Sequence, residues 1–243
     1  MATRIAILNC YDIRRSLFNF DGRNVDEAEL LTERIRSFSK VNTDMFDVFN
    51  SEFPIEDYDA YVISGSHFNP DRHSIAKNAW MRDLLSFIRK THQDRVPLLG
   101  ICFGHQMISV ALGAKVFELV EFESGYRKVI IDERYHSPLF KDVPKEFYGA
   151  FFHKWAVYRH SLPFGSKLLA TSPDIPDQAA AFAKGESTFA VQFHPERVAR
   201  DVKVMTHLYK DTSYNAKKVP HRISSDANVQ VLKNFVKWVA KRK

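Results

Sequence analysis

The sequence predicts an α/β fold: a doubly wound, mostly parallel sheet with an added antiparallel part. In the first half of the chain, short apolar runs alternate with amphipathic segments, which is typical of buried parallel strands separated by helices. In the second half, short strand-like runs follow one another with turn residues between them, which favours antiparallel pairing. No linker, repeat or low-complexity segment divides the sequence, so we expect residues 1–243 to form a single domain.

The first half is expected to start with a strand over residues 3–10, a short apolar run rich in isoleucine. A polar and aromatic loop, 11–23, follows. Asn24 and Glu27, three residues apart, resemble a capping box, and apolar residues at helical spacing continue to Phe38. The other elements expected here are strands 44–50, 60–64 and 97–101 and helices 74–90 and 103–112, the last closed by Gly113.

The second half is expected to complete the sheet with short strands. The runs that predict them are 115–120, 126–131, 146–152, 167–172, 179–184 and 188–194. A last helix is expected over 225–241, because its valines and leucine recur on one helical face.

Composition and charge narrow the function classes. Hydrophobic residues make up 45% of the 243 residues, as in ordinary soluble domains. Two cysteines cannot build a disulfide framework in a chain of this size, so we expect a reducing, cytoplasmic setting. No apolar run reaches the ~20 residues of a membrane helix, and the N-terminus does not resemble a signal peptide. The net charge of +6 is spread along the chain apart from the tail KWVAKRK, so we expect neither a nucleic acid nor a membrane as partner.

One cysteine lies in a sequence that predicts a nucleophile. Gly100-Ile-Cys102-Phe-Gly104 follows an apolar strand and precedes a helix, the form of a nucleophile elbow with cysteine in place of serine. Small neighbours are needed because the backbone of such a turn is crowded. A helix N-terminus favours a thiolate. The alternative is a buried structural cysteine at a tight packing turn, which is how we interpret Cys10.

A base for this nucleophile is predicted at the end of a later strand. His194 closes the run TFAVQFH, and Glu196 follows across Pro195. The proline favours an extended residue before it, which would hold both side chains on one side and let the carboxylate orient the imidazole. Taken alone, a His-x-Glu pair is more often an ordinary surface pair.

Together these motifs resemble a known family. GICFGHQ (100–106) followed by QFHPE (192–196) is similar to the signature of class I glutamine amidotransferase domains. Other stretches fit in the same order, from the first strand to about residue 196: SGS (64–66), ALGAKV (111–116), ESGY (123–126) and SPLFKDVP (137–144). The resemblance implies the flavodoxin-like fold of that family.

The resemblance also implies roles for individual residues. Cys102 would attack the side-chain amide of glutamine and form a γ-glutamyl thioester. His194 would carry the proton to departing ammonia and then activate water, and Glu196 would orient His194. The backbone N–H groups of Gly65 and Phe103 would form the oxyanion hole. The family chemistry requires no metal or cofactor.

The substrate-binding part departs from the family pattern. Gln106 would help to hold the amino-acid end of the substrate, and His153 and Val157 fit the family's His-x-Asp-x-Val stretch. Lys154 and Trp155 stand where family members have small and acidic residues. Neither side chain accepts a hydrogen bond, so this departure affects the choice of substrate more than the chemistry, unless the loop simply packs differently.

Three functions remain open from the sequence. The first is a stand-alone cysteine hydrolase of glutamine or another γ-glutamyl compound, similar to the small members called GMP-synthase-like, which include γ-glutamyl peptidases. The second is an ammonia-supplying subunit of a separate synthetase, since no phosphate-binding loop is present in the sequence. The third is a non-catalytic interaction protein on the same scaffold. Segments 11–23 and 211–224 are expected to set specificity.

Overall fold

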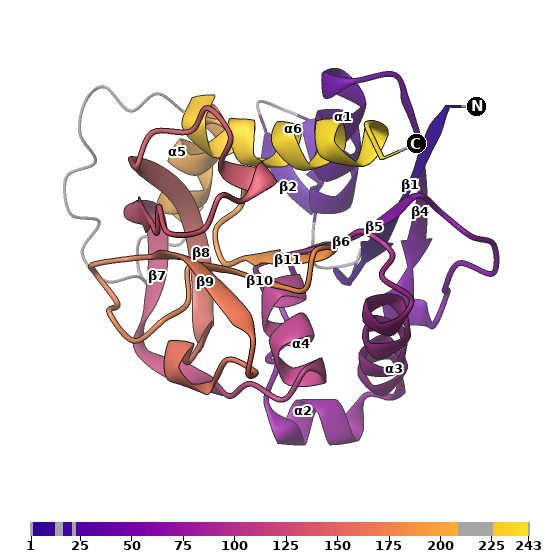
Figure 1. The fold of residues 1–243 in the computed structure, drawn as a ribbon, viewed down its shortest axis with the longest axis horizontal. Coiled ribbons are helices and arrows are strands. Elements are labelled where there is room, and N and C mark those ends of the chain that lie inside the picture. Colours follow the sequence, from indigo (N-terminus) through magenta and orange to yellow (C-terminus); the bar gives the residue numbers. More distant parts are fainter. Residues whose placement is uncertain (1, 13–16, 21–22, 209–225, 243) are drawn as a thin grey trace.

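The computed structural model describes residues 2–12, 17–20, 23–208 and 226–242, so that segment 211–224 lies outside it. The described residues form a nine-stranded sheet in the order β4-β1-β5-β6-β11-β10-β9-β7-β8, in which the first five strands are parallel and the others pair antiparallel (Figure 1). The predicted fold class is confirmed. The parallel strands are β1 (Thr3–Asn9), β4 (Val41–Asp47), β5 (Ala60–Ile63), β6 (Leu98–Ile101) and β11 (Thr188–Val191).

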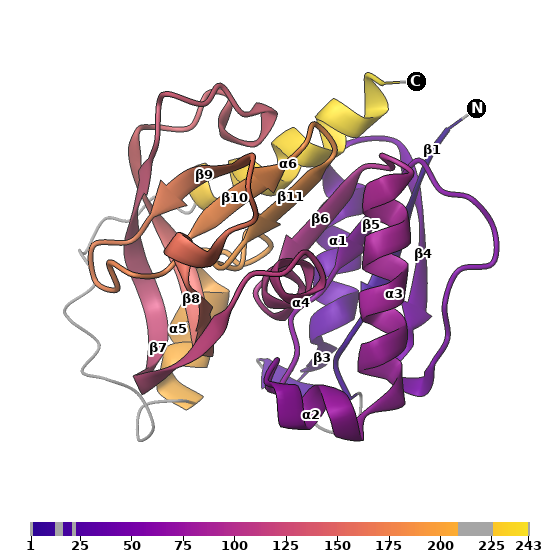
Figure 2. The ribbon, with the colours of Figure 1, turned by 60° about the horizontal axis from the view of Figure 1, so that its bottom comes forward.

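Helices cover both faces of the parallel part (Figure 2). Strand residues alternate between the faces: Ile5 and Ile7 pack with α1 (Glu27–Phe38) and α6 (Asp226–Ala240). Ala6 and Leu8 pack with α3 (Ala79–Gln93) and α4 (Phe103–Ala111) on the opposite face. Burial on both sides explains why these strands are almost wholly apolar.

The antiparallel part is dominated by two long strands. β7 (Val116–Ile131) pairs with β8 (Glu146–Val157), and their register shifts between Glu118 and Glu123. β9 (Ser166–Thr171) and β10 (Ala181–Lys184) connect this pair to β11. α5 (Ala199–Leu208) packs against β7 through buried Val202 and Met205.

The start of the first helix differs from the prediction. α1 begins at Glu27, and Asn24 lies in β3 (Arg23–Asp26), which pairs antiparallel with β2 (Leu17–Phe20). Asn24 is therefore not the helix N-cap, because the residues directly before Glu27 form a paired strand. The predicted loop 11–23 thus includes one strand of this hairpin, while residues 13–16 and 21–22 lie outside the described part.

Four other elements also differ from the prediction. Helix 74–90 is two helices, α2 (Arg72–Lys77) and α3, because Asn78 is extended and donates its side-chain amide to the Ser74 carbonyl. The strand predicted over 44–50 is shifted to β4 and ends in a 3₁₀ turn, η1 (Val48–Asn50). The runs 115–120 and 126–131 are one strand, β7, and helix α5 was not predicted.

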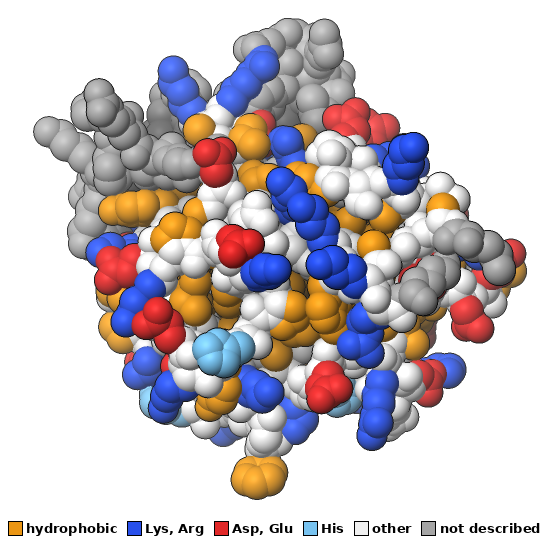
Figure 3. Space-filling model, turned by 45° about the horizontal axis from the view of Figure 1, so that its top comes forward, with side chains coloured by type: hydrophobic (Ala, Val, Ile, Leu, Met, Phe, Trp, Pro, Cys, Tyr) orange, Lys and Arg blue, Asp and Glu red, His pale blue; other side chains and the backbone are white. Residues whose placement is uncertain are grey.

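Surface charge is mixed on the face shown in Figure 3. Lys and Arg side chains are spread over it with acidic, apolar and neutral side chains among them. Within the described residues, no helix is long and apolar enough to cross a membrane.

Candidate active site

The predicted site residues gather at one edge of the sheet. β5, β6 and β11 are parallel neighbours, with Ile63 opposite Gly100 and Ile101 opposite Val191. Their carboxyl ends therefore lie side by side, which is where open α/β sheets place their sites. Gly65, Cys102 and His194 follow these strand ends, which are Ile63, Ile101 and Val191, within at most three residues.

Cys102 occupies a strained turn between β6 and α4. Its φ of 52° and ψ of −102° are rare for a residue with a side chain. A Cβ on Gly100 would lie 2.5 Å from the Gly104 backbone, and a Cβ on Gly104 would lie 2.5 Å from the Ile63 carbonyl oxygen. Both glycines are thus required by close backbone packing, as the sequence predicted. The turn places a 4% exposed Cys102 at the helix N-terminus.

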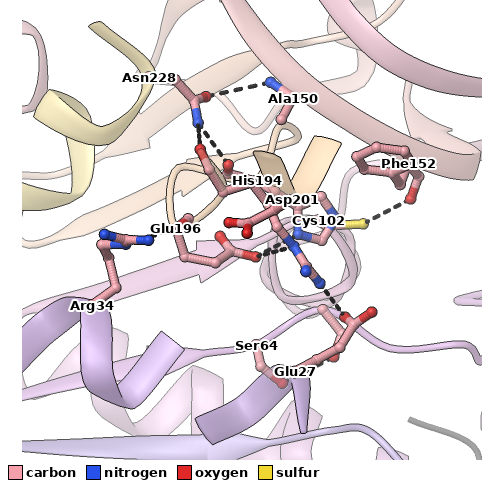
Figure 4. A network of polar contacts seen from close by, with 12 residues as sticks. Glu27, Arg34, Ser64, Cys102, Ala150, Phe152, His194, Glu196, Asp201 and Asn228 are labelled. Atoms are coloured by element: carbon pink, nitrogen blue, oxygen red, sulfur yellow. Dashed lines mark hydrogen bonds and ion pairs between the residues drawn. The ribbon is translucent and has the colours of Figure 1, made fainter. Parts of the chain in front are cut away.

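His194 and Glu196 form a buried pair beside this cysteine (Figure 4). Nδ1 of His194 lies 2.7 Å from Oε1 of Glu196. Because a carboxylate only accepts hydrogen bonds, Nδ1 carries the proton and Nε2 is left for Cys102. Burial lowers the pKa of His194, but the charges and hydrogen bonds of Glu196 and Cys102 outweigh it and raise this pKa to about 10. The arrangement has the connectivity of a nucleophile, a base and an orienting acid.

The backbone around the pair is held by two helices. Asn228 of α6 donates its side-chain amide to the carbonyls of His194 and Arg197 at 2.8 and 3.0 Å. Arg34 of α1 donates Nε to the Glu196 carbonyl at 3.1 Å. His194 N–H donates to the Ala150 carbonyl at 2.7 Å. These bonds fix the turn after β11 without using the reactive side-chain atoms.

The two predicted oxyanion-hole residues lie in the turn after β5 and at the start of α4. The backbone N–H groups of Gly65 and Phe103 have no hydrogen-bond acceptor among the described residues. Phe103 is the first residue of α4, where an N–H is normally unsatisfied. A Cβ on Gly65 would collide with the Tyr11 hydroxyl and lie 3.1 Å from Cε1 of His194. Gly65 therefore lies directly against the imidazole.

Gln106 and His153, predicted to bind substrate, have protein partners in this structure. Both donate to the Trp155 carbonyl, Gln106 through Nε2 and His153 through Nδ1. Nε2 of His153 lies 2.7 Å from Oε2 of Glu123. Both residues are 3% exposed. Their contact with substrate remains a prediction. Lys154, the other departure from the family pattern, donates to the Val120 carbonyl.

Sequence reasoning missed three residues of the site. Tyr11 lies next to Gly65, and Arg197 lies next to Glu196 with a 2.9 Å ion pair to Glu27. Arg197 directly follows Glu196 in the sequence, and this position is the signal that could have identified it as a site residue. Tyr11 and Glu27 come from the far end of the chain, and Glu27 also fits a capping box, so no sequence signal separated them from ordinary helix and loop residues.

The raised pKa of His194 predicts its titration. Its imidazole is expected to lose its proton near pH 10, where an ordinary histidine does so near 6.5. Because the folded-state pKa is the higher one, the stabilisation is complete below about pH 6.5 and disappears as pH rises through about 10. NMR of the imidazole, assigned with His194→Gln, measures this. Glu196→Gln is expected to lower this pKa and to reduce turnover by about 10⁴-fold. Titration of wild-type His194 near 6.5 would refute the charge pairing.

Comparisons with known proteins show which family this sequence matches. The family model for glutamine amidotransferase class-I matches residues 28–207. A glutamine-hydrolysing GMP synthase subunit of Methanocaldococcus jannaschii is 40% identical over 102 residues, covering 42% of this chain and 52% of that protein. The putative anthranilate synthase component II of Haemophilus influenzae is 30% identical over 118 residues, covering 49% and 60%. The matched segment thus spans about half the length of these curated relatives.

The fold comparison covers the whole chain. A glutamine amidotransferase structure from Thermotoga maritima superimposes with a TM-score of 0.71 at 22% identity, over 100% of this chain and 98% of that one. Identity this low shows the fold alone, whereas the family match covers most of the sequence. The chain belongs to the class I glutamine amidotransferase family.

Proposed function

We propose that this protein is a cysteine hydrolase that cleaves the γ-amide of glutamine or of a γ-glutamyl compound through a γ-glutamyl thioester. The observation that carries the proposal is the side-by-side placement of Cys102, on its strained turn, with the buried His194–Glu196 pair. Class I family membership supports this reaction type, and the site has a candidate for each group that acyl transfer from an amide needs.

The first half of the reaction releases ammonia. The Cys102 thiolate attacks the amide carbon, and the carbonyl oxygen gains negative charge. The His194 imidazolium then gives its Nε2 proton to the amide nitrogen as the C–N bond breaks, so that ammonia leaves and the thioester remains. Glu196 keeps the imidazole ring oriented throughout through the 2.7 Å bond to Nδ1.

The second half releases glutamate. Neutral His194 takes a proton from water, and the resulting hydroxide attacks the thioester carbon. The C–S bond breaks, and the thiolate and imidazolium are restored together. In both halves the N–H groups of Gly65 and Phe103 are available to stabilise the oxyanion, because neither has another acceptor within the described residues.

A second candidate function is an ammonia-supplying subunit. The relatives named as a GMP synthase subunit and as anthranilate synthase component II favour it, since those names describe parts of synthases. In this function the chain would be slow alone and would be accelerated by a synthetase in trans. The same triad would act in both cases, so the two functions differ in partner and rate only.

Glutamate release with two substrates separates these functions. Purified protein is given glutamine or a γ-glutamyl peptide, and glutamate is measured for each. We expect turnover of at least one substrate, because the described site contains all three proposed catalytic groups. Preference for the peptide would make the protein a γ-glutamyl peptidase.

Slow turnover of both substrates that rises when a synthetase is added would favour the ammonia-supplying role. Absence of turnover with intact folded protein, with and without a synthetase, would favour the non-catalytic interaction protein and would contradict the proposal.

A further inference from the structure

Two further charged side chains, Arg197 and Glu27, lie next to the proposed triad. Nε of Arg197 lies 3.8 Å from Oε1 of Glu196, the oxygen that also contacts His194. Nη2 of Arg197 lies 2.9 Å from Oε2 of Glu27, the first residue of α1. The side chains of Arg197 and Glu27 are each 4% exposed. With His194 protonated, four buried charges of alternating sign therefore follow one another from His194 through Glu196 and Arg197 to Glu27.

The Arg197–Glu196 contact acts through charge and not through a hydrogen bond. Nε of Arg197 and Oε2 of Glu196 are both buried, and neither has a hydrogen-bond partner in the described part of the chain. At 3.8 Å the cation attracts the carboxylate without taking its hydrogen-bonding oxygen from His194. Because both side chains are almost wholly buried, this attraction is screened much less than at a surface.

Such a cation meets a need of the proposed reaction cycle. While His194 is protonated, it balances the charge of Glu196. When His194 gives its proton to ammonia, Glu196 would become a buried anion without a cation, which is costly. Arg197 remains charged throughout, and Glu27 in turn balances Arg197.

We propose that Arg197 and Glu27 are positioning residues that keep Glu196 ionised and aimed at His194 in both protonation states of the imidazole. This inference rests on the proposed function of the triad. It also explains why the chain places a buried ion pair between α1 and the turn after β11.

Several other ionisable groups face this charge network. Cys102 faces His194 from the turn after β6, and Tyr11 lies close to Glu196, Arg197 and Glu27 from the end of β1. Asp201 of α5 also acts on Arg197, and the Arg34 guanidinium of α1 lies 3.1 Å from the Glu196 carbonyl. None of these groups changes in the variants below, so the effects of the two altered charges are isolated.

Two charge-removing variants are expected to move the His194 titration in opposite directions. Arg197→Gln removes a cation near the imidazolium, so the pKa of His194 should rise by about one unit. Glu27→Gln leaves Arg197 without its counter-charge, so this pKa should fall by about one unit. Arg197→Lys keeps the charge and should leave the titration near the wild-type value. NMR of the His194 imidazole measures all three without requiring turnover.

A double variant that removes both charges keeps the proposal testable if a single variant does not fold. Breaking one partner of a buried ion pair is strongly destabilising, whereas Glu27→Gln with Arg197→Gln removes both charges and should return the titration toward wild type. Shifts of equal sign in the two single variants would overturn the proposal. So would an unchanged titration in Arg197→Gln, or, if that variant does not fold, in Glu27→Gln. Failure of the proposed function is distinguishable, since it would appear as unchanged glutamate release in Cys102→Ala.

Discussion

Replacing Cys102 by alanine is expected to reduce glutamate release by at least about 10⁴-fold, because the attacking sulfur is lost and no other group takes its place. The fold should be kept. Alanine has the same β-carbon as cysteine, so the strain at φ 52° is unchanged, and only one buried sulfur is removed. Steady-state glutamate release and circular dichroism of the variant measure both effects.

The second cysteine provides a matched control. Cys10 is fully buried, its Sγ lies 3.7 Å from the Leu8 carbonyl, and burial raises the pKa of its thiol far above the usual range. It is thus a packing residue, and Cys10→Ala should keep most of the wild-type rate. Activity that depends on Cys10 and survives loss of Cys102 would contradict the assignment of the nucleophile.

Gly104→Ala is expected to destabilise the protein by about 3 kcal/mol. The added methyl would lie 2.5 Å from the Ile63 carbonyl oxygen and 2.9 Å from the Ile63 Cβ, and neither atom belongs to a flexible side-chain end. Strand β5 or the turn holding Cys102 must therefore shift, so turnover should fall as well. Denaturant unfolding and glutamate release measure the two losses.

The direction of the stability change in Gly104→Ala separates close packing from helix propensity. Gly104 lies inside α4, and helix propensity alone predicts that alanine stabilises such a position by about 1 kcal/mol. Ser86→Ala on the exposed side of α3 serves as the control, since it removes only one bond to the Arg82 carbonyl. A Gly104→Ala protein as stable as wild type would show that the close packing of the elbow is incorrect.

The site could be predicted from sequence where its residues are local. Cys102 with its two glycines, and His194 with Glu196, each lie within a five-residue stretch next to a strand end. Parallel strands bring their carboxyl ends to one edge, so the two motifs meet once the fold class is known. The parallel half of the fold could also be predicted, because each of its buried strands is a short apolar run that is visible locally in the sequence.

The remaining parts depend on distant contacts. Glu27 reaches Arg197 only because α1 packs beside the turn after β11, and nothing near Glu27 in the sequence indicates this. Asn24 has a propensity to cap a helix, but here it lies in β3 and pairs with β2. Tertiary structure thus overrides a local preference. The continuity of β7 depends on its pairing with β8 across an irregular stretch, which hydrophobic periodicity does not detect.

The most direct test is to trap the covalent intermediate. Protein is mixed with labelled glutamine or a labelled γ-glutamyl peptide, quenched in acid within one turnover, and digested for mass spectrometry. We expect a γ-glutamyl group on the peptide that contains Cys102, released by hydroxylamine and absent in Cys102→Ala. Glutamate release with no adduct on Cys102, or with the label on another residue, would contradict the proposed mechanism.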